Sequence, residues 1–88
     1  MMFRKKDGLY VEEIDGTIVV FDSENEKFCS FENSAADIWK QLAEDGIETI
    51  TKNICEKYEV NNETARKDIE EFIQRLLELG LIYQELPV

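Results

Sequence analysis

The chain has 88 residues, of which 43% are hydrophobic and 34% are charged. A chain of this length builds one hydrophobic core and is too short for two. Twenty acidic residues against ten basic residues give a net charge of −10, which disfavours nucleic acid and anionic membranes but suits a basic or amphipathic polypeptide partner. We expect a single domain over residues 1–88, with residues 1–7 as an N-terminal arm and residues 84–88 as a C-terminal tail.

The first half of the chain carries the signals of strands. Two β-rich runs, Leu9–Ile14 and Thr17–Asp22, flank Asp15-Gly16, a pair typical of tight hairpins because glycine adopts positive φ without penalty. A polar break at residues 23–26 precedes a third extended run, Lys27–Phe31. These runs predict a three-stranded antiparallel meander.

The second of these runs is apolar on both faces. Ile18 and Val20 point to one side of the strand, and Val19 and Phe21 point to the other. This pattern predicts a sheet that is covered on both faces rather than open to water on one.

Two short helical segments follow the strands. Residues 34–44 carry apolar side chains at helical spacing, with Asn33 as the N-cap and a stop at Asp45-Gly46. Residues 50–58 show the same spacing, with Thr49 as the cap.

The third and longest predicted helix covers residues 62–79. Asn61 is its expected N-cap and Gly80 its C-terminal stop, after which residues 81–83 are extended. Strands followed by helices indicate an α+β fold. The predicted architecture is therefore an N-terminal three-stranded antiparallel β-meander followed by a three-helix, winged helix-turn-helix-like bundle.

The cysteines, the lack of histidine and the hydropathy of the chain bear on its possible disulfides, metal sites and cellular location. Cys29 and Cys55 lie far apart, and we expect both to be free thiols. The chain has no His, so we expect no metal site and no cofactor. No apolar run reaches the roughly 18 residues of a membrane span or the roughly 7–15 residues of a signal-peptide core, so we expect a cytoplasmic protein.

The passage from the third strand into the first helix has a distinctive order. It reads Lys27-Phe28-Cys29-Ser30-Phe31-Glu32-Asn33-Ser34-Ala35-Ala36-Asp37-Ile38-Trp39, which is an aromatic strand, an Asn, a turn of small residues and an aliphatic-Trp pair. Together with residues 50–60, residues 65–76 and the closing Leu79-Gly80-Leu81-Ile82, it resembles the PqqD family over about residues 8–83. The sequence departs from that pattern at Phe31 and Glu32, where an aliphatic residue followed directly by Asn is expected.

The resemblance implies a non-catalytic domain that binds the N-terminal leader of a ribosomally synthesised precursor peptide. The leader would lie along the third strand and against the third helix, and the domain would serve a modifying enzyme such as a radical-SAM enzyme or a lasso-peptide protease. The residues expected to contact the peptide are Lys27, Phe28, Cys29, Ser30 and Phe31 in the strand and Ala65, Asp68, Ile69, Phe72, Arg75 and Leu76 in the helix.

Strand addition is physically reasonable for such a meander. The third strand lies at an edge, where unpaired backbone groups accept a further strand. Each backbone hydrogen bond contributes about 0.5–1.5 kcal/mol, whereas association costs about 4–15 kcal/mol. Side-chain pockets must supply the rest, with Asp68 and Arg75 orienting the peptide through charge.

Several of these side chains also have a purely structural interpretation. Phe28 and Phe31 are either core aromatics or groove residues, and Trp39 is expected in the core. The stripe on the third helix is expected to be chiefly core, with Ile73 and Leu77 inside.

The charged residues leave further alternatives open. Lys27 and Asp68 pair either with the peptide or with each other. The basic run Arg4-Lys5-Lys6 is either a frayed terminus or a contact with the enzyme or the precursor.

Two other functions compete with leader binding. A structural or dimerisation module would pair the edge strand or the spare sheet face with a second copy. A DNA-binding winged helix would use the third helix, which carries Arg66, Lys67 and Arg75 against Glu63, Asp68, Glu70, Glu71 and Glu78, a balance that disfavours phosphate contact. An enzyme is the least favoured class, because the sequence has no His, no nucleophile motif and no phosphate loop.

Overall fold

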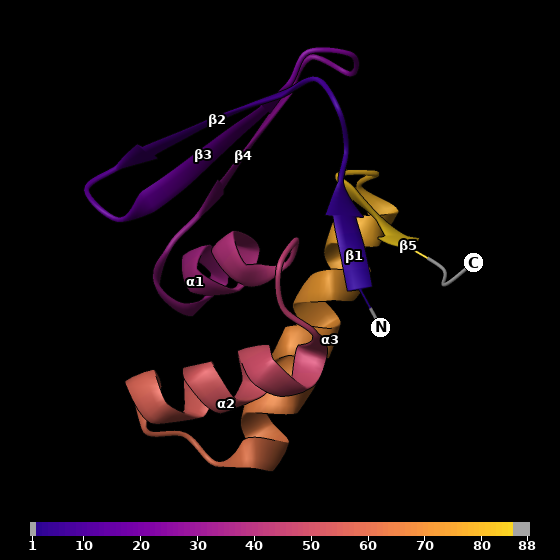
Figure 1. Cartoon of the computed structure of the whole chain (residues 1–88). Coiled ribbons are helices and arrows are strands. Elements are labelled where there is room, and N and C mark those ends of the chain that lie inside the picture. The colour runs from indigo at the N-terminus through magenta and orange to yellow at the C-terminus, as the bar shows by residue number, and fades with distance from the viewer. Residues whose placement is uncertain (1, 86–88) are drawn as a thin grey trace.

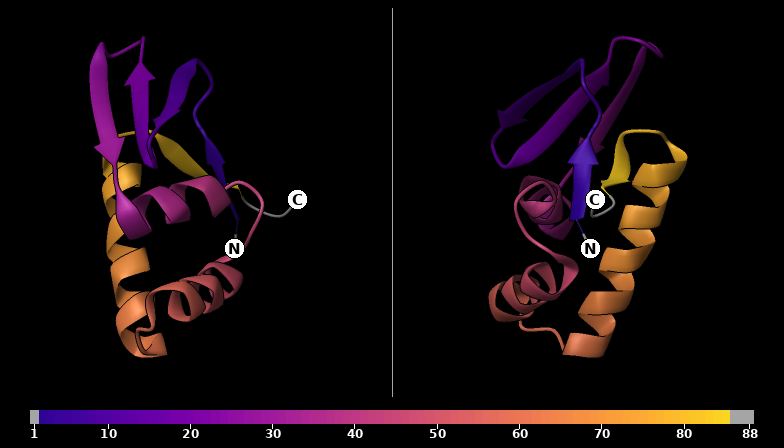
Figure 2. Two further views of the ribbon diagram at one scale, coloured as in Figure 1. Left: turned by 90° about the vertical axis from the view of Figure 1, so that its left-hand side faces the viewer. Right: turned by 45° about the vertical axis from the view of Figure 1, so that its right-hand side comes forward.

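The computed structural model describes residues 2–85 and contains two small sheets and three helices (Figure 1). The elements in chain order are β1 (Met2–Lys5), β2 (Leu9–Ile14), β3 (Thr17–Asp22), β4 (Lys27–Phe31), α1 (Asn33–Gln41), α2 (Ile47–Tyr58), α3 (Asn62–Glu78) and β5 (Ile82–Glu85). Helix α1 lies between the larger sheet and α2, while α3 runs crosswise to both of these helices (Figures 1 and 2). The predicted α+β class is confirmed.

The larger sheet is the predicted antiparallel meander, with strand order β2-β3-β4. Its first turn contains Asp15 at φ 50° and Gly16 at φ 84°, the two positive φ values that a tight two-residue hairpin turn requires. Strand β4 pairs with β3 on one side only, and the register places Ile18 opposite Phe31. The three predicted strands and the edge position of β4 are confirmed.

One face of the meander forms part of the core. Ile18 and Val20 are buried there, whereas Val19 and Phe21 on the other face are only half-buried. Within residues 2–85, no helix or other strand covers this outer face (Figure 1). The prediction of a sheet covered on both faces is therefore wrong for the described part of the chain.

The first two helices begin earlier than predicted, and neither predicted cap is used. Helix α1 begins at Asn33, and its N-cap position, Glu32, makes no side-chain hydrogen bond. Helix α2 begins at Ile47 after Gly46, so Thr49 lies inside its first turn.

Helix α1 also ends earlier than residue 44, the predicted limit. The N–H of the buried Leu42 donates to the carbonyls of Ile38 and Trp39, at 3.1 and 3.4 Å, which tightens the last turn. Residues 43–46 then reverse the chain so that Ile47 packs against the core. Burial of Leu42 and Ile47 therefore outweighs the capping propensities read from the sequence.

Both predicted ends of α3 are confirmed to within one residue. The side chain of Asn61 accepts a hydrogen bond from the N–H of Thr64 at 2.8 Å. Gly80 has φ 73°, and its N–H donates to Leu77 while the N–H of Leu81 donates to Leu76, a Schellman motif. This motif directs the chain into β5.

A second sheet joins the two ends of the described chain. Strand β1 pairs antiparallel with β5, with Met2 opposite Glu85 and Lys5 opposite Ile82. Phe3 in β1 is 4% exposed, so this strand belongs to the core. The structure thus places residues 2–5 of the predicted arm and residues 84–85 of the predicted tail in a sheet, and residues 86–88 lie outside the described residues.

Arg4 and Lys5 of the basic run lie in β1, so the first of the two alternatives, a frayed terminus, is wrong. Arg4 lies 4.0 Å from a carboxylate oxygen of Glu85. The ammonium of Lys5 lies 4.6 Å from the centre of the Trp39 ring, and burial lowers the pKa of this lysine, an effect that the charge of Glu44 opposes.

The core joins both sheets and all three helices. Trp39 is 1% exposed, as predicted. Cys29 and Cys55 are half-buried free thiols, which confirms that prediction. No helix within residues 2–85 is long and apolar enough to cross a membrane.

Candidate functional site

Side chains along β4, the strand at the open edge, point alternately to the two faces of the sheet. Lys27, Phe28 and Ser30 are exposed, Cys29 is half-buried and Phe31 is 8% exposed. Phe28 and Phe31, whose positions the sequence left open, therefore differ: Phe28 lies on the outer face and is 73% exposed, whereas Phe31 is a core aromatic. Backbone groups on the free side of β4 have no partner strand in the described sheet.

Phe31 connects β4 to α3. Its ring lies 5.3 Å from that of Trp39 and 5.2 Å from that of Phe72, the latter in an edge-to-face arrangement. Phe72 is half-buried, so part of its ring is accessible beside the strand. The strand and the helix that the sequence assigned to one site thus meet at Phe31 and Phe72.

The other predicted residues of α3 divide into core and surface. Ala65, Ile69 and Leu76 are buried. Asp68 and Arg75 are exposed, and with Phe72 they follow a spacing of four and three residues, which places them on one stripe of the helix. A partner beside β4 would therefore contact this stripe, while the three buried side chains hold the helix in place.

Lys27 and Asp68 do not form an ion pair with each other. The register places Lys27 opposite Asp22, next to the turn between β3 and β4. Asp68 lies in the first half of α3, one turn before the residue that meets the opposite end of β4. The two charges therefore mark opposite ends of the candidate groove.

An apolar pocket of about 310 Å³ lies where β4 leads into α1. It opens between the start of α1, the end of α2 and the start of α3, and its lining consists of Asn33, Ser34, Ile38, Ile54, Tyr58, Val60, Ala65, Asp68 and Ile69. Such a pocket can accept one large apolar side chain. It includes three of the predicted site residues, Ala65, Asp68 and Ile69.

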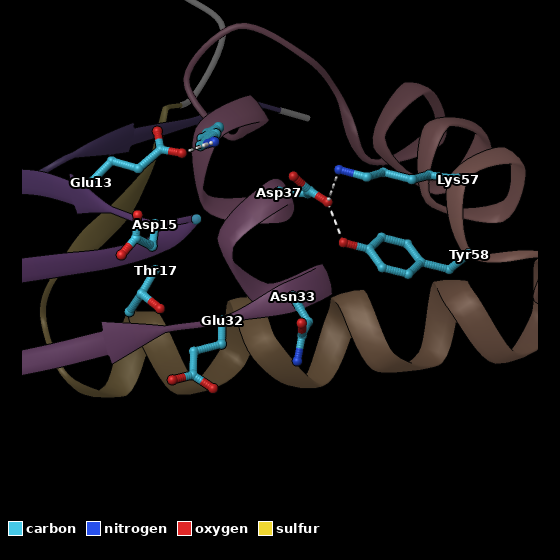
Figure 3. A pocket seen from close by; sticks show the side chains of 10 residues that line it. Glu13, Asp15, Thr17, Glu32, Asn33, Asp37, Lys57 and Tyr58 are labelled. Carbon is cyan, nitrogen blue, oxygen red and sulfur yellow. Dashed lines mark hydrogen bonds and ion pairs between the residues drawn. The ribbon is translucent and has the colours of Figure 1, made fainter.

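A polar cluster lies on the other side of Tyr58 (Figure 3). The Tyr58 hydroxyl donates a hydrogen bond to a carboxylate oxygen of Asp37, and the Lys57 ammonium lies 2.8 Å from the same oxygen. Burial alone would raise the pKa of Asp37, but the hydrogen bonds from Lys57 and Tyr58 outweigh it and hold the pKa below its usual value. The cluster thus ties α1 to the end of α2.

The open cavity beside this cluster has a volume of about 540 Å³ and is strongly polar. Glu13, Asp15 and Glu32 line it together with Asp37, and the Lys40 ammonium lies 2.9 Å from a carboxylate oxygen of Glu13. Within residues 2–85, no group of three or more His, Cys, Asp and Glu side chains is arranged to hold a metal ion.

The sequence pattern of a known family covers most of these elements. The model for the family described as coenzyme PQQ synthesis protein D (PqqD) matches residues 17–82, from the start of β3 to the start of β5. The chain belongs to the PqqD family.

Solved structures show the same fold. "TbiB1 in Complex with the TbiA(beta) Leader Peptide" superposes with a TM-score of 0.87 at 22% identity, over 96% of this chain and 99% of that chain. "Lasso peptide synthetase B1 complexed with the leader peptide" superposes with a TM-score of 0.88 at 22% identity, over 96% of this chain and 100% of that chain. A search of the curated proteins finds no match.

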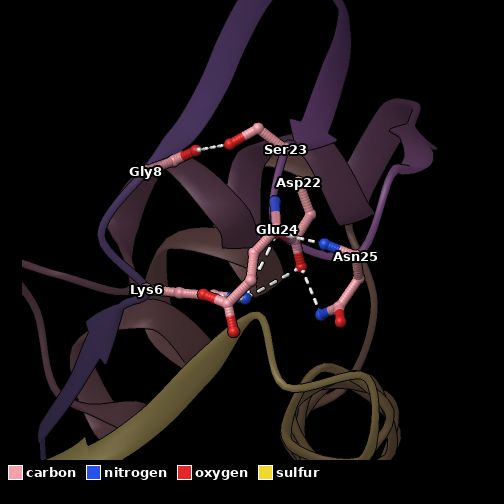
Figure 4. A network of polar contacts seen from close by, with 6 residues as sticks. All are labelled: Lys6, Gly8, Asp22, Ser23, Glu24 and Asn25. Carbon is pink, nitrogen blue, oxygen red and sulfur yellow. Dashed lines mark hydrogen bonds and ion pairs between the residues drawn. The ribbon is translucent and has the colours of Figure 1, made fainter.

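In this PqqD-family chain, a buried carboxylate fixes the turn that leads into β4 (Figure 4). Asp22 is 2% exposed and accepts hydrogen bonds from the Lys6 ammonium, at 3.1 and 3.2 Å, and from the side-chain amide of Asn25, at 2.9 Å. The N–H groups of Glu24 and Asn25 also donate to it, at 3.1 and 3.4 Å. These bonds tie the chain after β1 to the turn between β3 and β4.

We expect Asp22→Asn to lower the thermal stability, because a neutral amide is a weaker acceptor for the half-buried Lys6 ammonium. Hydrogen bonds from Asn25 and Lys6 hold the pKa of Asp22 below its usual value of 3.8. The stabilisation is therefore present above this pH and is lost as the pH falls through the lower folded-state pKa. Melting curves between about pH 7 and about pH 2 should show the difference between wild type and variant shrinking below about pH 4. The exposed Asp7→Asn serves as the control, and a difference independent of pH would contradict the assignment.

Sequence reasoning missed the pocket residues contributed by α1, α2 and the connection to α3. It used the apolar residues of 34–44 and 50–58 only as evidence of helices, and it gave Val60 no role. The available signal was Val60, an apolar residue in an otherwise polar connection, which proves 38% exposed. In this PqqD-family chain it lies at the rim of the apolar pocket.

Tyr58 lines both the apolar pocket and the polar cavity. Its hydroxyl should stabilise the contact between α1 and α2, because it donates to Asp37. We expect Tyr58→Phe to lower the free energy of unfolding by about 1 kcal/mol, because one hydrogen bond to a carboxylate is lost while the ring remains. Urea denaturation near neutral pH measures the change. Tyr83→Phe, at an exposed tyrosine of β5, should leave the midpoint unchanged, and equal losses in both variants would argue against a specific role for the Asp37 contact.

Proposed function

We propose that the domain binds the leader segment of a ribosomally synthesised precursor peptide as an added strand on β4 and presents it to a separate modifying enzyme. The observation that carries the proposal is the open edge of β4 beside the accessible stripe of α3, with an apolar pocket at the end of the groove. The two solved structures with this fold, both of them leader-peptide complexes, support it. The domain itself performs no chemistry in this proposal.

Backbone pairing orients the leader, and side chains supply most of the affinity. Strand β4 has five residues, so pairing along one edge provides only a few hydrogen bonds, each contributing about 0.5–1.5 kcal/mol. Burying one large apolar side chain contributes about 1.5–3 kcal/mol more. We therefore expect one leader side chain in the 310 Å³ pocket and another against Phe72.

The charges around the groove favour a particular placement of basic and acidic groups along the bound leader. Asp68 lines the pocket, Arg75 lies two turns further along α3, and Lys27 stands at the opposite end of β4. A basic group near the pocket and an acidic group near Arg75 would fit this pattern. The net charge of −10 further favours a leader that is basic overall.

The proposed contacts keep the full set of eleven residues expected from the sequence. The β4 residues Lys27, Phe28, Cys29, Ser30 and Phe31 pair through their backbone, and Asp68, Phe72 and Arg75 offer accessible side chains. Ala65 and Ile69 line the apolar pocket from the core, and Leu76 supports the helix. The enzyme served would be a lasso-peptide protease or a radical-SAM enzyme, and likeness to a lasso peptide synthetase B1 favours the first. Because precursors are made on ribosomes, we place the encounter in the cytoplasm.

An NMR titration tests the proposal. The labelled domain is titrated with the synthetic leader of a short precursor encoded beside it, and the backbone amides of residues 27–31 and 65–76 are followed. Saturable shifts in both segments are the expected result. Absence of shifts, together with a stable dimer that uses the β4 edge, would instead support a dimerisation module.

The remaining alternative is a DNA-binding winged helix. The winged helix-turn-helix description of the three helices stays a prediction, and α3 would be its recognition element. The exposed acidic side chains of α3 outnumber its basic ones, which disfavours contact with phosphates. Salt-dependent binding to duplex DNA would support this alternative, and none is expected.

A further inference from the structure

Three aromatic rings form one row across the uncovered face of the meander. Tyr10 lies opposite Phe21, and Phe21 lies opposite Phe28. The ring centres of Tyr10 and Phe21 are 6.3 Å apart, and those of Phe21 and Phe28 are 4.6 Å apart in a stacked arrangement. The row runs from the edge strand β2 to the edge strand β4.

Phe28 is the last ring of this row and stands at the open edge. One side of its ring is stacked on Phe21, yet 73% of the residue is exposed. An exposed aromatic at the end of a stacked row leaves apolar surface in water, which a further side chain would cover.

A strand added to β4 would bring one side chain into this position. Directly opposite residues of paired strands have Cβ atoms about 4.5–5.5 Å apart and point to the same face of the sheet. The leader residue opposite Phe28 would therefore point outward and continue the row. Its sequence neighbour opposite Cys29 would point to the other face, toward Phe31 and α3.

We propose that Phe28 forms an outer-face subsite that selects an aromatic or large aliphatic residue at one position of the leader. The inference rests on the proposed strand addition at β4 and adds a specificity determinant on the face opposite α3. The domain would thus contact leader side chains on both faces of the added strand. The leader would carry apolar residues at adjacent positions rather than at every second position.

A displayed peptide library tests the subsite. Random peptides of about 12 residues, roughly twice the length of a strand, are selected on immobilised wild-type protein and on Phe28→Ala. Selected peptides are then checked by NMR for shifts of the β4 amides, and their aromatic positions are replaced by Ala one at a time. Tyr10→Ala is the matched control, because it removes a ring of the same row at the edge remote from β4.

The expected result is a preference for one outward aromatic or large aliphatic position in peptides that shift the β4 amides. Phe28→Ala should weaken these peptides by about three- to tenfold, and replacing the outward residue should cause no further loss in that variant. Tyr10→Ala should leave affinity unchanged. Because Phe28 is largely exposed, the variant should keep its fold, which thermal unfolding verifies.

Three results would overturn the subsite, and they separate its failure from that of the proposed function. Peptides that shift the β4 amides but bind wild type and Phe28→Ala equally would exclude the subsite and leave strand addition intact. If no selected peptide shifts the β4 amides, strand addition itself fails and the subsite fails with it. Equal losses in Tyr10→Ala and Phe28→Ala would also exclude it, because the whole face rather than the open edge would then be in contact.

Discussion

Replacing Phe72 with Ala is expected to weaken leader binding by about thirtyfold or more, the effect of removing a central aromatic anchor. Phe72 is the accessible aromatic of α3 beside β4, and its ring contacts Phe31. Its loss would remove the wall against which the inward side chains of an added strand pack. Titration calorimetry with the leader measures the change.

Leu77→Ala is the matched control for this experiment. Leu77 is also half-buried and on α3, but it lines a separate groove beside Phe3 and Ile73, away from β4. It should reduce stability without changing affinity for the leader. If both variants lose affinity equally, the effect comes from loosening α3, and Phe72 is not a contact residue.

Replacing Ile69 with Ala is expected to lower the free energy of unfolding by about 2–5 kcal/mol. Ile69 is fully buried, and it forms part of the floor of the apolar pocket. A domain of this size has a total stability of only about 4–13 kcal/mol, so the loss would be a large part of it. Urea denaturation measures the change, and the exposed Glu70→Ala should have little effect.

The same variant separates the core role of Ile69 from its place in the pocket. Truncation deepens the pocket, so a bulkier side chain in the leader should regain affinity in Ile69→Ala. A stability loss below about 1 kcal/mol would indicate that the surrounding side chains collapse into the space. In that case the pocket is less rigid than its lining suggests.

The strands of the meander and the ends of α3 could be predicted because short-range chemistry determines them. Asp15-Gly16 requires a tight turn, Asn61 caps a helix with its own side chain, and Gly80 adopts the positive φ at which α3 stops. These residues determine backbone conformation locally, whatever the rest of the chain does. The family resemblance read from residues 27–39 and from the later helices agrees with the family match.

Features that depend on distant partners could not be predicted in this way. The run β1 is only four residues long, and nothing near it in sequence reveals that it pairs with β5. The start of α2 depends on Ile47 reaching the core, which overrides Thr49 as a cap. The apolar pocket arises where three helices meet, so its members are recognisable only once those helices are placed.

The pairing of β1 with β5 has a consequence for how the molecule folds. The turns of the meander and the capped helix α3 involve residues close in sequence, and their formation closes only short loops. The β1–β5 ladder joins nearly the two ends of the chain and therefore carries the largest loop-closure entropy of any pairing in the described fold. We expect it to form last, after the core already holds both strands near each other. On this order the edge of β4 forms before the chain is fully closed, so a bound leader would raise the population of the partly closed state rather than the rate of the final step.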